Sequence, residues 1–340
     1  MHHTCFEGNH YDMGLRWGAA LAEKGFFLME RAPFPVTKQR RRFARESLPF
    51  YERYFPEILE ELRALARGQG CPEEELEGLV LSMYAIGPAC ACSCFAVSAG
   101  GRVLLGRNSD FWAALEEENR NVIYRFSGEN YDFSGNTTAF VEMEDGVNRE
   151  GLAVGLTAVC PTGLRPGFNA GMLVRYCLEK CGTVEQALEA ICMLPRGSAQ
   201  TITLADRSGA VAVAECCPEK VEILRGTEDR PFVWAVNGFF APGMAPFRVE
   251  GVDDWQAERR GKTLEKALTG CKGRLRTAQA QRLLAGEYGF LCQYDRSEGK
   301  DTVWSVVYDL SQGVVYRAEG NPGRTPFQRD ERFAFFGKEG

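Results

Sequence analysis

The stretch CSCFAVSAGGRVLLGRNSDFW, residues 92–112, decides how this chain folds. Two runs rich in Val, Leu, Phe and Ala stand on either side of a Gly-Gly pair, which is the pattern of a β-hairpin. Pairing about that turn places Cys94 opposite Arg107. It also places Cys92 opposite Ser109, at the open end of the hairpin. The hairpin therefore brings a thiol close to a guanidinium.

Three cysteines stand at alternate positions around the first run. On a strand, Cys90, Cys92 and Cys94 would share one face. Arg107 and Asp110 on the second run would lie beside Cys92. A guanidinium near a thiol stabilises the thiolate, and a carboxylate can hydrogen-bond an amine. The alternation is also compatible with core packing or with a metal site, so the cysteines alone do not fix the chemistry.

The distribution of histidines restricts that chemistry further. All three, at positions 2, 3 and 10, lie within the first ten residues. This argues against a Ser-His-Asp or Cys-His triad and excludes zinc sites of the HExxH kind. Cleavage between Ala91 and Cys92 would supply a different base, because the pKa of an α-amine is about 7.7–8.0 and the amine would share a residue with the thiol.

Composition indicates a globular protein, with 45% hydrophobic and 25% charged residues among 340. The net charge of −6 argues against nucleic acid as the main partner. No apolar run is long enough to span a bilayer, and the first residues lack the basic-then-apolar pattern of a secretory signal. The 13 cysteines are odd in number and scattered, which predicts mostly free thiols and a cytoplasmic location.

Hydrophobic periodicity predicts the order of elements. Residues 1–88 are predicted to be mostly helical, and from residue 92 the pattern changes to strands with glycine-rich turns. The strand candidates are TAFVEMED, GLAVGLTAV, AQTITLADRSGAVAVAE, FVWAVNGFF and DTVWSVVYDLSQGVVYRAEG. Between them, AGMLVRYCLEKCGTVEQALEAICML predicts two helices. Strands with helices inserted between them indicate an α+β layered fold.

Residues 92–112 also resemble the nucleophile hairpin of the N-terminal-nucleophile (Ntn) hydrolases related to choloylglycine hydrolase. They are most similar to the branch typified by acyl-CoA:6-aminopenicillanic-acid acyltransferase. The family pattern is Cys-Ser/Thr-x-Phe, a hairpin, and Gly-Arg-Asn-x-Asp, and only Cys92 fits its register. Further similar fragments follow in the family's order: FEGNHYDMGLRWG, GVNREGLAVGLTAV, ITLADRSGAVAVAE, VNGF and TVWSVVYDLSQGVVYRAEGNP.

The resemblance implies a role for each matching residue. Cys92 would be both the self-processing residue and the nucleophile, with cleavage after Ala91. Arg107 and Asp110 would hold the substrate and the new α-amine. Asn237, in AVNGFF, corresponds to the asparagine of the oxyanion hole, whose amide donates to the tetrahedral intermediate.

Three further positions match the family less closely. Thr157 stands where bile-salt hydrolases carry a second oxyanion asparagine, so its backbone N–H or hydroxyl would have to substitute. A later family arginine corresponds best to Arg260 in AERRGKTL, with Arg259 as a competitor. Where the family often reads Cys-x-His, this chain has CQYDR, and Tyr294 in the place of the histidine is assigned no role.

The fold implied is the four-layer αββα sandwich of this superfamily, with two antiparallel sheets between helical layers. Residues 1–91 would form a helical pro-segment that stays associated, and residues 92–340 the catalytic domain. The implied reaction is hydrolysis of a linear amide in a small N-acyl molecule through a thioester, with no cofactor or metal. An acyl-CoA-dependent N-acyltransferase is the nearest alternative, and a non-catalytic cysteine-rich or metal-binding protein is the alternative from another class. The sequence leaves open whether the protein is a homo-oligomer.

Aromatic residues at 111, 112, 168, 239 and 240 suggest an apolar acyl site.

Overall fold

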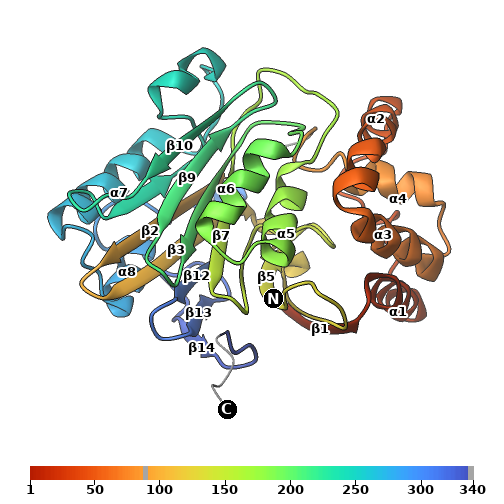
Figure 1. Cartoon of the computed structure of the whole chain (residues 1–340), viewed down its shortest axis with the longest axis horizontal. Helices are drawn as coiled ribbons and strands as arrows, with labels where there is room; N and C mark the ends of the chain where they lie inside the picture. Colours follow the sequence, from red (N-terminus) through yellow and green to blue (C-terminus); the bar gives the residue numbers. More distant parts are fainter. Residues whose placement is uncertain (87–90, 336–340) are drawn as a thin grey trace.

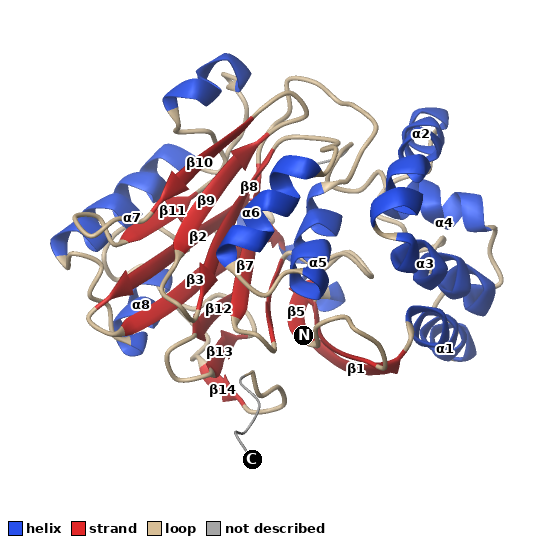
Figure 2. Ribbon diagram, viewed as in Figure 1, coloured by secondary structure: helices blue, strands red, loops and turns tan. Residues whose placement is uncertain are grey.

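In the computed structural model, which describes residues 1–86 and 91–335, two β-sheets pack face to face between helices (Figures 1 and 2). The eight-stranded sheet has the order β1-β4-β5-β6-β7-β8-β9-β10 and the six-stranded sheet the order β11-β2-β3-β12-β13-β14. The first sheet consists of β1 (His2–Gly8), β4 (Arg120–Phe126), β5 (Phe133–Thr137), β6 (Asp145–Asn148), β7 (Leu152–Ala158), β8 (Gln200–Asp206), β9 (Val211–Cys216) and β10 (Val221–Arg225). The second consists of β2 (Ala91–Ala99), β3 (Arg102–Trp112), β11 (Phe232–Ala235), β12 (Lys300–Asp309), β13 (Val314–Ala318) and β14 (Gln328–Asp330).

Helices cover the outer faces of both sheets. Helices α5 (Ala170–Lys180) and α6 (Val184–Met193) pack on the eight-stranded sheet, and α7 (Ala257–Gly270) and α8 (Thr277–Leu284) pack on the six-stranded sheet. Strands β2 and β3 face β7 and β8 across the interior. The predicted four-layer αββα arrangement is therefore confirmed. None of the helices within the described residues is both long and apolar enough to cross a lipid bilayer.

The β2–β3 hairpin has the predicted register. Cys92 pairs with Ser109, and Cys94 pairs with Arg107. At the turn, Gly100 and Gly101 have φ angles of 63° and 73°. Two consecutive left-handed residues are typical of the tight turn that matches the twist of a hairpin, and glycine adopts that conformation without a steric cost.

The N-terminal region is mostly helical, as predicted, but it begins with a strand. Helices α1 (His10–Glu23), α2 (Lys38–Tyr54), α3 (Pro56–Gln69) and α4 (Glu73–Val80) gather beside the sandwich, as Figure 1 shows, but β1 is a strand. It pairs in parallel with β4, and every other pair of neighbouring strands is antiparallel. The N-terminal region thus supplies the edge strand of the eight-stranded sheet.

The predicted strand TAFVEMED is wrong for most of its length. Residues 138–144 form turns after β5, and a strand resumes only at Asp145. Phe140 adopts a left-handed φ of 58°, which interrupts an extended chain. Two carboxylates of this turn point inward, where Glu142 accepts a hydrogen bond from Asn169 (2.8 Å) and Glu144 accepts one from Tyr84 (2.8 Å).

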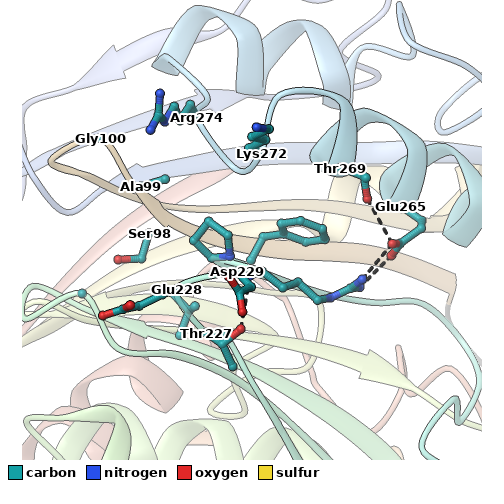
Figure 3. A pocket seen from close by; sticks show the side chains of 16 residues that line it. Ser98, Ala99, Gly100, Thr227, Glu228, Asp229, Glu265, Thr269, Lys272 and Arg274 are labelled. Carbon is teal, nitrogen blue, oxygen red and sulfur yellow. Dashed lines mark hydrogen bonds and ion pairs between the residues drawn. The ribbon is translucent and has the colours of Figure 1, made fainter.

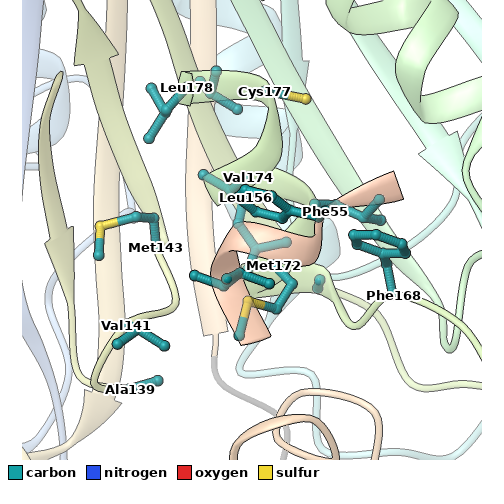
Figure 4. Packing of buried hydrophobic residues seen from close by; sticks show 14 of the residues in the cluster. Phe55, Ala139, Val141, Met143, Leu156, Phe168, Met172, Val174, Cys177 and Leu178 are labelled. Carbon is teal, nitrogen blue, oxygen red and sulfur yellow. The ribbon is translucent and has the colours of Figure 1, made fainter. Parts of the chain in front are cut away.

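The largest hydrophobic core joins the N-terminal helices to the sandwich. Figure 4 shows Leu156 of β7 beside Met172 and Val174 of α5, with Phe55, which separates α2 from α3, packed nearby. All four side chains are fully buried. Because this core is continuous, residues 1–86 are built into the same hydrophobic interior as the sheet.

A buried ionic cluster joins the same two parts of the chain. Arg175 of α5 donates to Glu61 of α3 (2.8 Å) and also pairs with Glu179. His10 of α1 lies 3.0 Å from Glu179, and Tyr124 of β4 donates to Glu61 (2.8 Å). Buried charges are tolerated where they pair with each other, so this cluster fixes α1 and α3 against α5.

Candidate active site

The centre of the site is the contact between Cys92 and Arg107. Cys92 lies at the start of β2, and its sulfur is 2.9 Å from Nη2 of Arg107. The other nitrogens of this buried guanidinium donate to Leu156 O (2.9 Å) and Asp145 Oδ2 (2.7 Å), and Nη2 also lies 3.1 Å from Glu144 Oε2. Burial opposes the charge of Arg107, but Cys92, Asp145 and Glu144 outweigh it and raise its pKa well above the ordinary value. The guanidinium is therefore charged and held in one orientation.

The facing strand makes room for this guanidinium. A Cβ on Gly155 of β7 would lie 2.7 Å from the sulfur of Cys94 and 3.4 Å from Cδ of Arg107. Asp145, which anchors the other end of the guanidinium, is itself held by Trp304 Nε1 (3.0 Å) and Tyr308 Oη (2.6 Å) of β12. Close approach at Gly155 and these two donors together fix Arg107 beside Cys92.

The neighbouring cysteines have different surroundings. Cys94 is fully buried, and burial raises the pKa of its thiol to about 12. Its thiol is therefore unreactive at neutral pH, because the thiolate is the nucleophile. Cys90, the third member of the alternating set, lies outside the described residues. Within the described ranges 1–86 and 91–335, no group of three or more His, Cys, Asp and Glu side chains is arranged to hold a metal ion.

Asn237 and Arg260 hold the backbone of Cys92. The N–H of Cys92 donates to Oδ1 of Asn237 (2.9 Å), and Nη2 of Arg260 donates to the same oxygen (2.7 Å). Nη1 of Arg260 donates to the carbonyl oxygen of Cys92 (2.5 Å) and to Oγ of Ser93 (3.0 Å). Both polar groups of the Cys92 main chain are thereby bound by side chains from distant segments.

The structure distinguishes between the two arginine candidates. Arg260 is fully buried, and its guanidinium also donates to the carbonyl oxygens of Trp255 (3.0 Å) and Asp254 (2.7 Å). Arg259 instead hydrogen-bonds Gln256 (3.0 Å) near the surface and lies over the ring of Phe290. Arg260, and not Arg259, reaches Cys92.

Asp110 lies at the edge of this group. It accepts hydrogen bonds from Thr302 Oγ1 (2.6 Å) and Tyr294 Oη (2.9 Å), and Arg260 Nη1 is 3.8 Å from it. Burial raises the pKa of Asp110 to about 6, and Arg260 partly offsets that rise. Tyr294, to which the sequence assigned no role, is thus a partner of a predicted site residue.

Thr157 contributes to the site less directly than the resemblance to the family implied. Its hydroxyl donates to the carbonyl oxygen of Val236 (3.1 Å) and also bonds the hydroxyl of Thr201. The next residue, Ala158, packs against Cys92, and its carbonyl accepts from Nδ2 of Asn237 (2.8 Å). The end of β7 therefore lies at Cys92, but the Thr157 hydroxyl is engaged with other groups.

Sequence reasoning missed Glu144 and Asp145, which bind Arg107, as well as Tyr84. Glu144 accepts from Tyr84 Oη (2.8 Å), from Ser109 Oγ (3.1 Å) and from Arg107. The available signal was the three acidic residues that stand among the apolar residues of FVEMED, two of them adjacent. A buried carboxylate requires a cation or several donors, so acids predicted to lie in a core strand indicate a buried arginine nearby.

Two hollows differ in their distance from Cys92. The larger, of about 1080 Å³, surrounds the tip of the β2–β3 hairpin near Ser98 and Gly100 (Figure 3) and is polar. The strand rise of 3.3 Å per residue puts that tip roughly 20 Å from Cys92. The smaller, of about 290 Å³, is lined by Tyr84 and Phe111, the two residues that pack against Cys92 and Ala158. The small pocket is therefore the one that adjoins the site.

A sequence model of the acyl-coenzyme A:6-aminopenicillanic acid acyl-transferase family matches residues 97–324. The chain belongs to this family. Its membership confirms the resemblance to this family, and the matched residues include the hairpin from Val97 onward. No curated protein matches the chain.

The solved structures that the chain resembles share little sequence with it. A variant of conjugated bile acid hydrolase from Clostridium perfringens has 12% identity and a TM-score of 0.44, covering 72% of this chain and 98% of the hydrolase. A second mutant of that hydrolase has 13% identity and a TM-score of 0.42, over 72% and 98%. Penicillin V acylase from Agrobacterium tumefaciens has 14% identity and a TM-score of 0.39, over 67% of this chain and 82% of that one.

Proposed function

We propose that this protein is a self-processing cysteine hydrolase that cleaves a linear amide bond of a small N-acyl molecule through a thioester. One observation carries the proposal. The sulfur of Cys92 lies 2.9 Å from Arg107 while its backbone nitrogen is held by Asn237 (2.9 Å). The first contact suits a nucleophilic sulfur, and the second positions the nitrogen that would become an α-amine.

Self-processing would begin with attack of the Cys92 sulfur on the carbonyl carbon of Ala91. The C–N bond between the two residues breaks, and the acyl group passes from nitrogen to sulfur. Water then cleaves that thioester, leaving a carboxylate on Ala91 and a free α-amine on Cys92. Asn237, steadied by Arg260, holds the same nitrogen before and after the break.

Substrate hydrolysis would repeat this chemistry with the new amine as base. The α-amine takes the thiol proton, and the thiolate beside Arg107 attacks the substrate carbonyl. We assign stabilisation of the oxyanion to the amide of Asn237 and a backbone N–H at the end of β7, near Thr157. The protonated α-amine returns its proton as the amine leaves, and water releases the acid. Asp110 would hold the α-amine throughout, and Arg260 would hold the carbonyl oxygen of Cys92.

The proposed division is a pro-segment, residues 1–91, and a catalytic domain, residues 92–340. Three features support continued association of the pro-segment with the catalytic domain after cleavage. They are strand β1, the shared core and the cluster around Arg175. The twelve cysteines within the described residues are all free thiols, in keeping with the expected cytoplasmic location.

Acyl transfer is a second candidate, favoured by the description of the matching family as an acyl-transferase. In that reaction an amine, instead of water, would attack the thioester formed on Cys92. Adding an amine acceptor during turnover and measuring the ratio of N-acyl product to free acid would separate the two reactions.

The first test is the intact mass of the purified protein beside Cys92→Ala and Cys94→Ala. We expect the wild type and Cys94→Ala to give two pieces, residues 1–91 and 92–340, and Cys92→Ala to give one uncut chain. Cys94 is a matched control because it stands on the same strand and is as fully buried as Cys92, and burial raises the pKa of its thiol. An uncut wild-type chain, with Cys92 no more reactive to iodoacetamide than the other thiols, would favour a non-catalytic cysteine-rich protein.

A further inference from the structure

We propose that the segment upstream of the cleavage site forms one wall of the acyl-binding pocket and sets the size of acyl group that the enzyme accepts. The acyl group fitted by this pocket is uncharged, apolar and compact. This inference rests on the proposed function, because it assigns the acyl half of the substrate to the small pocket beside Cys92.

The two walls of the pocket come from opposite sides of the cleavage site. The upstream wall consists of side chains from the loop after α1 and from the residues after α4, namely Phe26, Pro33, Phe34, Met83 and Tyr84. The downstream wall consists of side chains from the end of β3, from the 3-10 helix at 113–118 and from the turn after β5, namely Phe111, Trp112, Leu115, Thr138 and Phe140. Cleavage after Ala91 would therefore leave the pocket divided between two polypeptides.

The two walls meet at the nucleophile. Tyr84 from upstream and Phe111 from downstream both pack against the cluster of Cys92 and Ala158. Tyr84 Oη and Thr138 Oγ1 both donate to Oε1 of Glu144 (2.8 and 2.7 Å), whose other oxygen is 3.1 Å from Arg107. An acyl group lying in the pocket would therefore present its carbonyl carbon toward the sulfur.

The backbone at both walls adopts a conformation that bulky residues rarely take. Tyr84 has a φ of 53° and Phe140 a φ of 58°, and each places an aromatic ring on the pocket. Left-handed conformations at non-glycine residues concentrate at functional sites, where the surrounding structure holds them. Tyr84 is held by its hydrogen bond to Glu144, so the upstream wall is fixed to the catalytic domain.

The volume of the small pocket and the charge of its lining define the acyl group that it fits. An apolar cavity of about 150 Å³ accommodates a benzene ring. The volume of about 290 Å³ is about twice that, and it therefore fits one aromatic ring with a short linker, or a short alkyl chain. Arg31 and Glu118 are the charged members of the described lining, and the exposed Arg31 lies over the ring of Phe26 (4.5 Å). The rest of the lining offers no partner for a charged acyl group.

The test uses the processed enzyme and p-nitroanilides that differ only in the acyl group, from acetyl to dodecanoyl with phenylacetyl included. We expect kcat/KM to peak at a compact acyl group. Phe26→Ala should move the peak to longer chains and raise the ratio of dodecanoyl to phenylacetyl hydrolysis about tenfold. Phe27→Ala is the matched control, because Phe27 is the next residue on the same loop, is 38% exposed and does not line the pocket.

Leu115→Phe fills the same pocket from the downstream side and should move the peak to shorter chains. A folded and processed Phe26→Ala enzyme with the wild-type profile would overturn the inference, and so would an equal shift in Phe27→Ala. If Phe26→Ala does not fold, Phe34→Ala takes its place on the same wall, and an unchanged profile in that variant would also overturn it. An uncut wild-type chain that hydrolyses no anilide would instead refute the proposed function.

Discussion

Arg107 donates a hydrogen bond to the sulfur of Cys92 (2.9 Å). Arg107 stands two residues along β3 from Ser109, which is the register partner of Cys92. A long side chain can reach such a diagonal neighbour across a hairpin. The same guanidinium also binds Leu156, Asp145 and Glu144, so one side chain ties Cys92 to the facing sheet. Its planar geometry is the reason that one residue can serve four acceptors.

Replacing Arg107 by lysine should preserve the charge but not these contacts. An ammonium cannot span the sulfur, two carboxylates and a carbonyl at once. We expect kcat/KM for the best amide substrate to fall by about 100-fold or more. Steady-state kinetics would measure this, with Arg259→Lys as the control because Arg259 lies near the surface. Activity within a few-fold of the wild type would show that charge alone suffices.

Gly155→Ala tests whether the arginine depends on close approach of the sheets. The new Cβ would lie 2.7 Å from the sulfur of Cys94 and 3.4 Å from Cδ of Arg107. We expect a loss of about 1–3 kcal/mol in the free energy of unfolding, measured with urea, together with reduced activity. Gly163→Ala is the control, because a Cβ there meets only the end of Glu219 at 4.0 Å. Equal stability of the two variants would contradict the expectation.

Asp110 should make the stability of the uncut chain depend on pH. Its pKa is raised from 3.8 to about 6, mainly by burial, so the folded state holds a proton that the unfolded state has lost. The stabilisation is complete below pH 3.8 and is lost as the pH rises through 6, a change of about 3 kcal/mol. Urea unfolding of Cys92→Ala across this range should show the decline.

The double variant Cys92→Ala, Asp110→Asn removes the titrating group and should lose that pH dependence. Asp229→Asn in the same background alters an exposed carboxylate and should keep it. A parallel decline in the Asp110→Asn variant would assign the effect to another residue.

His10, in the N-terminal region, should make the free energy of unfolding depend on pH in a second range, above that of Asp110. Burial opposes its charge, but Glu179 and Glu61 outweigh both burial and Arg175 and raise the pKa of His10 above 6.5. This stabilisation is present below pH 6.5 and is lost as the pH rises through the raised pKa. We expect His10→Gln to flatten the dependence of unfolding free energy on pH above 6.5, and the exposed His2→Gln to leave it unchanged. The same slope in both variants would exclude His10 as the source.

The strand predicted for TAFVEMED shows where sequence patterns mislead. Its apolar residues and β-branched threonine favour a strand, but the chain turns at Phe140. The carboxylates of Glu142 and Glu144 find their partners in Asn169, Tyr84 and Arg107, which lie on other elements. Tertiary hydrogen bonds to buried acids thus outweighed local propensity.

The sequence by itself determined the hairpin, its register and the position of Cys92, because turn chemistry and strand alternation act between residues close together in the chain. Only the tertiary structure decided that Arg260 rather than Arg259 reaches Cys92, across 168 residues, and that Asp145 and Tyr294 hold Arg107 and Asp110. Those partners meet because two sheets and a helix bury them together. The pairing of buried charges is a property of the packed interior, which no local pattern encodes.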